Sequence, residues 1–195
     1  MAIGLLLGTL ALGCASRPRA GTSYLEAARN DPRKLPYVVG PSDVLRITVW
    51  KDPNLSSEGA VGPGGTITMP LVGEFPAAGR TVKQIQEEAT RRLAAFVKDA
   101  VVTVAVVEVN SYRFTVAGSV EHRGMFNPRY YVTVSEAIAL AGGPNRYASP
   151  ANVVVIRPAD SGAAQRIAID YEEILSGKNP AQDIVVLAGD TVLVP

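Results

Sequence analysis

Side chains on which reactive sites are often built are scarce in this 195-residue chain, which has one cysteine, Cys14, and one histidine, His122. A single cysteine forms no internal disulfide, so stability has to come from apolar cores. Zinc sites need several His and Cys ligands at fixed spacing, and that pattern is missing. His122 lies in the polar stretch EHRG, so we expect an exposed turn residue and no metal site.

The chain also has no large excess of positive or negative charge. The chain has 19 Lys and Arg against 18 Asp and Glu, a formal net charge of +1, and no long run of either sign. Nucleic-acid binders neutralise phosphates with clustered basic residues, so nucleic acid is not an expected partner. The glycine-rich residues 62–65 precede a strand pattern and not a helix, so they do not resemble a phosphate-binding loop.

Catalytic motifs are missing as well, including the serine-hydrolase elbow, the P-loop and HExxH. Asp43, Asp52 and Asp99 could act as glycosidase acids only if two of them faced one sugar across a cleft, and their spacing gives no such indication. Glu172 and Glu173 suit the first turn of a short helix. We therefore expect a protein without catalysis, cofactor or metal.

The N-terminus carries an apolar run, residues 1–13, that is too short to cross a bilayer and is typical of a secretory signal. Cys14 follows it directly, and LALGCAS resembles a bacterial lipobox, in which the cysteine becomes the lipidated first residue. We expect a lipoprotein signal peptide over 1–13 and lipidation of Cys14, with several acyl chains giving stable membrane attachment. Ala15 points, by the same resemblance, to the outer membrane. A buried thiol is the alternative.

Residues 14–36 are rich in Arg, Pro and small residues, which predicts a tether between a lipid and a folded body. The body begins near residue 37. Residues 43–50, DVLRITVW, alternate as a strand does, and GAV (59–61) with TITM (66–69) predict a hairpin closed by the intervening glycines. The β-branched run at 100–109 predicts the central strand of this first unit.

Two helices carry the same start signal, because Thr81 with Gln84 and Thr133 with Glu136 both match a capping box. Apolar residues then recur at spacings of three and four in the first helix: Val82, Ile85, Ala89, Leu93 and Phe96. The charged residues off this stripe predict a solvated or subunit-facing surface: Glu87, Glu88, Arg91 and Arg92.

A second unit is expected after residues 110–112, NSY. Its segments follow in chain order: the hairpin YRFTVAGSV and MFNP, the helix VSEAIALA, the strands NVVVIR and QRIAID, the short helix YEEIL capped by Asp170, and the strand TVLVP. This order is that of a ubiquitin-like β-grasp. The predicted fold class is thus α+β, with two small mixed units.

Aromatic side chains offer one further candidate surface: Trp50 and the tyrosines at positions 112, 130, 131 and 147. They could stack on sugar rings, or they could pack in the interior with a polar tip. We favour packing and leave stacking open.

The segments YVVGPSDVLRITVW, VGPGGTITMPLVGEF, VVTVAVVEVNSYRFTVAGSV, TVSEAIALAGGPNRYAS and LAGDTVLVP together resemble the outer-membrane polysaccharide export family of the Wza type. The resemblance covers 37–195. It implies a polysaccharide biosynthesis/export domain over 37–110 and one SLBB (soluble ligand-binding β-grasp) domain over 111–195. The family often has Gly where Ser42 stands, a substitution that looks tolerable in a turn.

The resemblance also implies a function. Family members form rings, usually octameric, that hang from the outer membrane and give a growing capsule or exopolysaccharide a passive channel. The implied partners are the polysaccharide chain, identical subunits and an inner-membrane polysaccharide copolymerase. Pro195 directly follows the last β-grasp strand, without the further SLBB unit and amphipathic helix of the full-length type, so we expect a short form that uses a separate outer-membrane pore partner.

Two other functions stay open at this point. One is a monomeric periplasmic β-grasp module that binds glycan or a protein partner. The other, ranked third, is a glycan hydrolase built on the scattered carboxylates.

Overall fold

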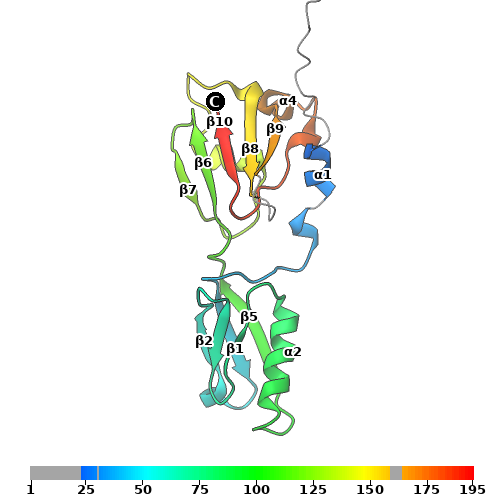
Figure 1. Cartoon of the computed structure of the whole chain (residues 1–195), viewed down its shortest axis with the longest axis vertical. Helices are drawn as coiled ribbons and strands as arrows, with labels where there is room; N and C mark the ends of the chain where they lie inside the picture. The colour runs from blue at the N-terminus through cyan, green and yellow to red at the C-terminus, as the bar shows by residue number, and fades with distance from the viewer. Residues whose placement is uncertain (1–22, 30, 159–163) are drawn as a thin grey trace, which may run out of the picture.

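A computed structural model describes residues 23–29, 31–158 and 164–195. Cys14, the predicted signal peptide and the first part of the predicted tether lie outside these residues. The described chain forms two units that follow one another along the long axis of the molecule (Figure 1). Within the described residues, no helix is both long and apolar enough to cross a membrane.

The first unit contains a three-stranded antiparallel sheet in the order β2-β1-β5. Its strands are β1 (Val44–Val49), β2 (Ser57–Ala60) and β5 (Val102–Glu108). The prediction that the run at 100–109 is the central strand is wrong. β1 holds the centre, because the strict alternation of its sequence buries Leu45, Ile47 and Val49 while both of its edges are paired.

The predicted hairpin between 59–61 and 66–69 is also wrong. β3 (Thr66–Met69) pairs with β4 (Gly73–Pro76), whereas β2 pairs with β1. Gly65, with φ of +79°, does close a turn, but that turn redirects the chain between two sheets. The β3–β4 pair buries apolar side chains in the core of this unit: Ile67, Met69 and Phe75.

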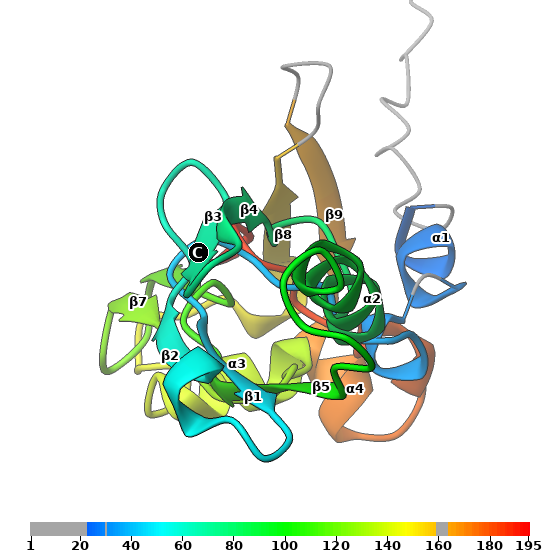
Figure 2. The ribbon, with the colours of Figure 1, turned by 90° about the horizontal axis from the view of Figure 1, so that it is seen from below.

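α2 (Val82–Leu93) packs against β5, and Figure 2 shows it nearly end-on. The predicted capping box of Thr81 and Gln84 is confirmed, with both reciprocal hydrogen bonds formed. Ile85, Ala89 and Leu93 are buried as predicted. Phe96 lies beyond the end of the helix and is 59% exposed, so its predicted place in the apolar stripe is wrong.

The second unit is a five-stranded sheet in the order β7-β6-β10-β8-β9, with β10 parallel to β6 and antiparallel to β8. Its elements in chain order are β6 (Phe114–Gly118), β7 (Gly124–Phe126), α3 (Val134–Leu140), β8 (Val153–Arg157), β9 (Gln165–Ile169), α4 (Tyr171–Leu175) and β10 (Thr191–Val194). A closing strand inserted between two hairpins is the β-grasp arrangement, so the predicted fold is confirmed. The capping box at Thr133 and the cap of α4 at Asp170 are confirmed too.

Part of the predicted tether is folded. α1 (Ser23–Arg29) lies beside β9 and the second unit's 3-10 helix η4 (Pro180–Gln182), as Figures 1 and 2 show. Tyr24 and Ala27 pack against the core of that unit. After a further 3-10 turn, η1 (Pro32–Lys34), the chain crosses to the first unit. Two other 3-10 turns are η2 (Pro53–Leu55) and η3 (Pro150–Asn152).

Candidate functional site at the junction of the two units

Asp43 is fully buried where the two units meet. Its Oδ1 accepts hydrogen bonds from the backbone N–H groups of Asn110 (2.8 Å) and Ser111 (2.7 Å), and its Oδ2 accepts from the backbone N–H of Gly40 (2.8 Å). The hydroxyls of Tyr37 (2.6 Å) and Ser111 (3.0 Å) also donate to Oδ2. One carboxylate therefore fixes the segment that enters the second unit.

Burial by itself would raise the pKa of Asp43, but hydrogen bonds from the backbone of Gly40, from Tyr37 and from the backbone of Ser111 and Asn110 outweigh it, so the pKa lies below its ordinary value. The carboxylate is consequently ionised at neutral pH. With no exposed surface it cannot reach a sugar, which contradicts a glycosidase role for Asp43.

Gly40 has a packing role at the same place. A Cβ on Gly40 would lie 2.4 Å from the Cβ of Ser111, far inside van der Waals contact. Residues 40–43, GPSD, thus supply both the close approach and the carboxylate that join the units. Ser42 within this turn has φ of +74°, a conformation in which glycine is the unstrained residue.

A cavity of about 370 Å³ opens beside this junction, and we call it the tyrosine cavity. Tyr37 belongs to both places, because its hydroxyl bonds Asp43 while its side chain lines the cavity. The lining residues come from η1, from the linkers on both sides of the junction and from the loop between β7 and α3: Arg33, Tyr37, Val109, Tyr112, Arg129, Tyr130 and Tyr131.

The rings of this cavity are held by the core. Tyr112 is 2% exposed, donates its hydroxyl hydrogen to the Val186 carbonyl (2.9 Å) and accepts from the Val132 N–H (3.1 Å). Tyr131 packs edge-on against Tyr112 with centroids 4.8 Å apart and lies 6.5 Å from the ring of Tyr37. Burial raises the pKa of Tyr112 to about 12 and also raises the pKa of Tyr131, so both hydroxyls stay protonated at neutral pH.

The five aromatic candidates from the sequence differ in burial. Packing is confirmed for Tyr112, and Tyr131 is half-buried. Packing is wrong for Trp50, Tyr130 and Tyr147, which are exposed by 69%, 65% and 72%. Tyr130 lines the tyrosine cavity, whereas Trp50 borders a separate hollow at the end of β1 and Tyr147 stacks with Arg146.

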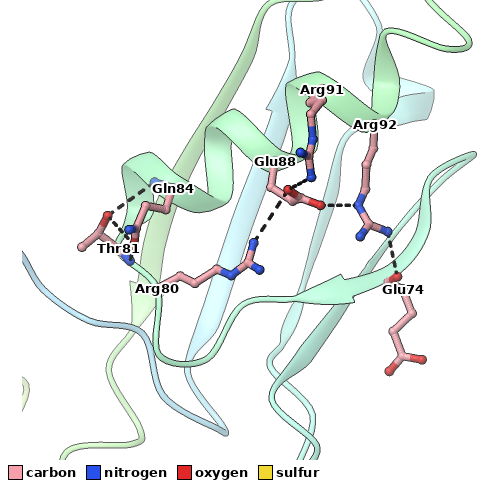
Figure 3. A network of polar contacts seen from close by, with 7 residues as sticks. All are labelled: Glu74, Arg80, Thr81, Gln84, Glu88, Arg91 and Arg92. Carbon is pink, nitrogen blue, oxygen red and sulfur yellow. Dashed lines mark hydrogen bonds and ion pairs between the residues drawn. The ribbon is translucent and has the colours of Figure 1, made fainter.

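A second polar cluster holds α2 in place (Figure 3). Glu88 is buried, and it pairs with Arg92 (2.6 Å), Arg91 and Arg80 (3.8 Å). The hydrogen bond from Arg92 is the main cause that lowers the pKa of Glu88, and the charges of the arginines add to it. Arg92 also lies over the ring of Phe75, 5.6 Å from its centroid. The prediction of a solvated surface is therefore wrong for Glu88.

The remaining candidates occupy ordinary positions. His122 is exposed in the β6–β7 turn, as predicted. Glu172 and Glu173 lie in the first turn of α4, as predicted. In the described ranges there is no group of three His, Cys, Asp or Glu that could hold a metal. Sequence reasoning missed the structural role of Asp43, because Asp43 and Ser111 are 68 positions apart and no local pattern links them. It also did not single out Arg129, which lines the tyrosine cavity.

Residues 31–107 match the family described as polysaccharide biosynthesis/export protein, and residues 113–168 match the SLBB domain. The chain therefore carries the polysaccharide biosynthesis/export domain followed by an SLBB domain. The predicted resemblance is confirmed. Asp43 lies within the first matched region, and the backbone of Asn110 and Ser111 that it holds lies between the two matched regions.

Several curated relatives carry informative names. The chain is 34% identical over 134 residues to the EPS I polysaccharide export outer membrane protein EpsA of Ralstonia solanacearum. This alignment covers 56% of this chain and 36% of the relative. It is 27% identical over 175 residues to the exopolysaccharide production protein ExoF of Rhizobium meliloti, and that alignment covers 84% of this chain and 38% of the relative. It is 27% identical over 173 residues to the capsule polysaccharide export protein BexD of Haemophilus influenzae, and that alignment covers 79% of this chain and 42% of the relative. The chain thus spans about two-fifths of the length of these relatives.

Proposed function

We propose that this protein is a subunit of an exopolysaccharide or capsule export channel at the outer membrane, facing the periplasm and anchored through a lipid on Cys14. The observation that carries the proposal is the match to an export domain followed by an SLBB domain, together with relatives named for polysaccharide export, among them an outer membrane protein. The export role agrees with the sequence-based expectation.

The channel acts passively. The most deeply buried carboxylates of this subunit have structural roles. Asp43 accepts hydrogen bonds at the junction, and Asp190 accepts from Arg157 (2.7 Å) and from the backbone N–H of Leu187 (2.7 Å). Carboxylates that are already fully hydrogen-bonded within the chain are poor acids or bases for chemistry on a substrate. Confinement of the polysaccharide, with an inner-membrane copolymerase supplying direction, requires no bond change by this subunit.

Identical copies form a ring, and rotational closure needs contact between two different patches of the surface. Support comes from three residues that flank elements of the first unit, after β1, after α2 and before β5: Trp50, Phe96 and Val101 are exposed by 69%, 59% and 60%. The backbone N–H of Trp50 donates to the backbone carbonyl of Val101 (2.9 Å), so these two residues lie next to each other. Neighbouring exposed apolar side chains such as Trp50 and Val101 favour a protein contact there, with a neighbouring subunit or another channel component.

The test is the size and shape of the full chain extracted in detergent, measured by light scattering and electron microscopy. A closed ring is expected. A monomer under all conditions would contradict the ring and favour a single glycan-binding module, for which the tyrosine cavity is the supporting observation. Palmitate labelling of the wild type that is absent from Cys14→Ser is the expected result for the lipid anchor.

A further inference from the structure

We propose that the tyrosine cavity binds one acidic sugar residue of the exported chain, with the sugar ring against Tyr130 and Tyr131 and its carboxylate on Arg129. This inference rests on the proposed export function and names a subsite for its substrate.

The size fits a sugar residue with room for its neighbours. A volume of about 370 Å³ lies within the range of about 300–1,000 Å³ that small-molecule sites occupy. The wall is mainly aromatic, and a pyranose ring presents C–H groups that pack on the electron-rich face of such rings. Tyr131 is braced by Tyr112 at 4.8 Å, so part of this wall is rigid before any ligand arrives.

The hydroxyl groups of the four tyrosines differ in availability. Those of Tyr37 and Tyr112 are already bonded, to Asp43 and to the Val186 carbonyl. Those of Tyr130 and Tyr131 form no hydrogen bond to any residue that the structure describes. Ser57 Oγ is the sole fully buried side-chain oxygen or nitrogen without a partner in the described ranges, so the unpaired Tyr131 hydroxyl is accessible to solvent, and Tyr131 lines the cavity. Two hydroxyls are therefore ready to bond sugar hydroxyls.

The charge of the wall favours an acidic sugar. Arg33 is paired with Asp31, with Nη2 and Oδ2 2.9 Å apart. Arg129 makes no ion pair within residues 31–158 and 164–195. A guanidinium without a carboxylate partner, next to aromatic rings, suits bidentate binding of a carboxylate from a ligand. A neutral sugar would offer no negative charge to pair with the Arg129 guanidinium.

The surroundings favour a chain over a free monosaccharide. A hollow of about 310 Å³ shares Tyr130 with the cavity and continues along α3 past Ala139 and Leu140. On the other side, a hollow of about 140 Å³ shares Arg33 and leads toward η4. Because each of these hollows shares a wall residue with the cavity, we assign the neighbouring sugars of the chain to them.

The test uses the full chain in detergent and two probes of equal length, a hexamer of galacturonic acid and a hexamer of glucose, with binding measured by titration calorimetry at low salt. We expect the acidic hexamer to bind about tenfold more tightly, the size of one charge-assisted contact. Arg129→Gln should abolish that preference, and Tyr130→Ala should weaken both hexamers. Matched controls are the exposed residues outside the cavity, Arg123→Gln and Tyr147→Ala, which should leave binding unchanged.

Equal affinity for the two hexamers, or binding that neither cavity variant alters, overturns the proposal. A change of particle size in Arg129→Gln or Tyr130→Ala without any effect on sugar binding also overturns it, because the cavity would then be a subunit contact. Circular dichroism checks that each variant folds. Particle size is measured in parallel: an intact ring that binds no acidic hexamer refutes only the subsite, whereas a monomer that binds it refutes only the ring.

Discussion

Replacement of Asp43 by asparagine tests the junction with the smallest change of shape. Asparagine keeps one oxygen and turns the other into an NH₂ donor. With the oxygen in the Oδ1 position, the bonds from Asn110 and Ser111 survive, and the hydroxyls of Tyr37 and Ser111 can rotate to accept from the NH₂. The N–H of Gly40, which donates at 2.8 Å, cannot rotate and loses its acceptor.

The expected cost follows from that geometry. One buried N–H without a partner costs about 1–3 kcal/mol, and loss of the charge weakens the retained bonds by about 1 kcal/mol more. We expect Asp43→Asn to lower the free energy of unfolding by about 2–4 kcal/mol. The control Ser111→Ala removes one hydroxyl donor and keeps every backbone donor, so it should cost about 1 kcal/mol.

The assay is urea denaturation followed by far-UV circular dichroism, because the fluorescence of Trp50, already 69% exposed, changes little on unfolding. Hydrogen exchange at the amides of Asn110 and Ser111 reports the junction directly, and Asp43→Asn should accelerate it. A variant within 0.5 kcal/mol of the wild type, with unchanged exchange, would refute the role given to this carboxylate.

Asp43 also makes the stability of the fold depend on pH. Because the folded pKa of Asp43 is lowered, its contribution to stability is present above the unfolded value of about 4 and is lost as pH falls through the folded value. The stability difference between wild type and Asp43→Asn should therefore shrink below about pH 4. A difference that stays constant down to pH 2 would contradict the assignment.

Other predictions concern three separate positions. Arg157→Met should destabilise the second unit by about 3–5 kcal/mol in thermal unfolding, because Asp190, 1% exposed, keeps a buried charge without its partner; a loss below 1 kcal/mol would refute this. Tyr112→Phe should cost about 1–3 kcal/mol in urea denaturation, since a buried backbone N–H and a carbonyl lose their hydroxyl partner, and no loss is the contrary result. Ser42→Gly should raise stability by about 1 kcal/mol, because φ of +74° strains serine; a lower melting temperature would contradict it.

Those parts of the protein that depend on nearby residues could be predicted from the sequence. Both capping boxes formed as expected, because Thr81 and Thr133 bond residues three positions away. The β-grasp order followed from alternating strand and helix patterns and from turn residues. The family was recognisable for a related reason, since its motifs occur in a fixed order along the chain.

The sequence alone determined the helix starts, the order of elements and the family, because these follow from contacts within a few residues and from the order of motifs. Only the tertiary structure decided that β1 takes the centre of the first sheet, that β3 pairs with β4, and that Asp43 joins segments 68 positions apart. It also decided that Glu88 is buried and that Tyr130 and Arg129 line one cavity. Strand partners and burial depend on how distant segments of the chain close on each other, and no local pattern records that closure.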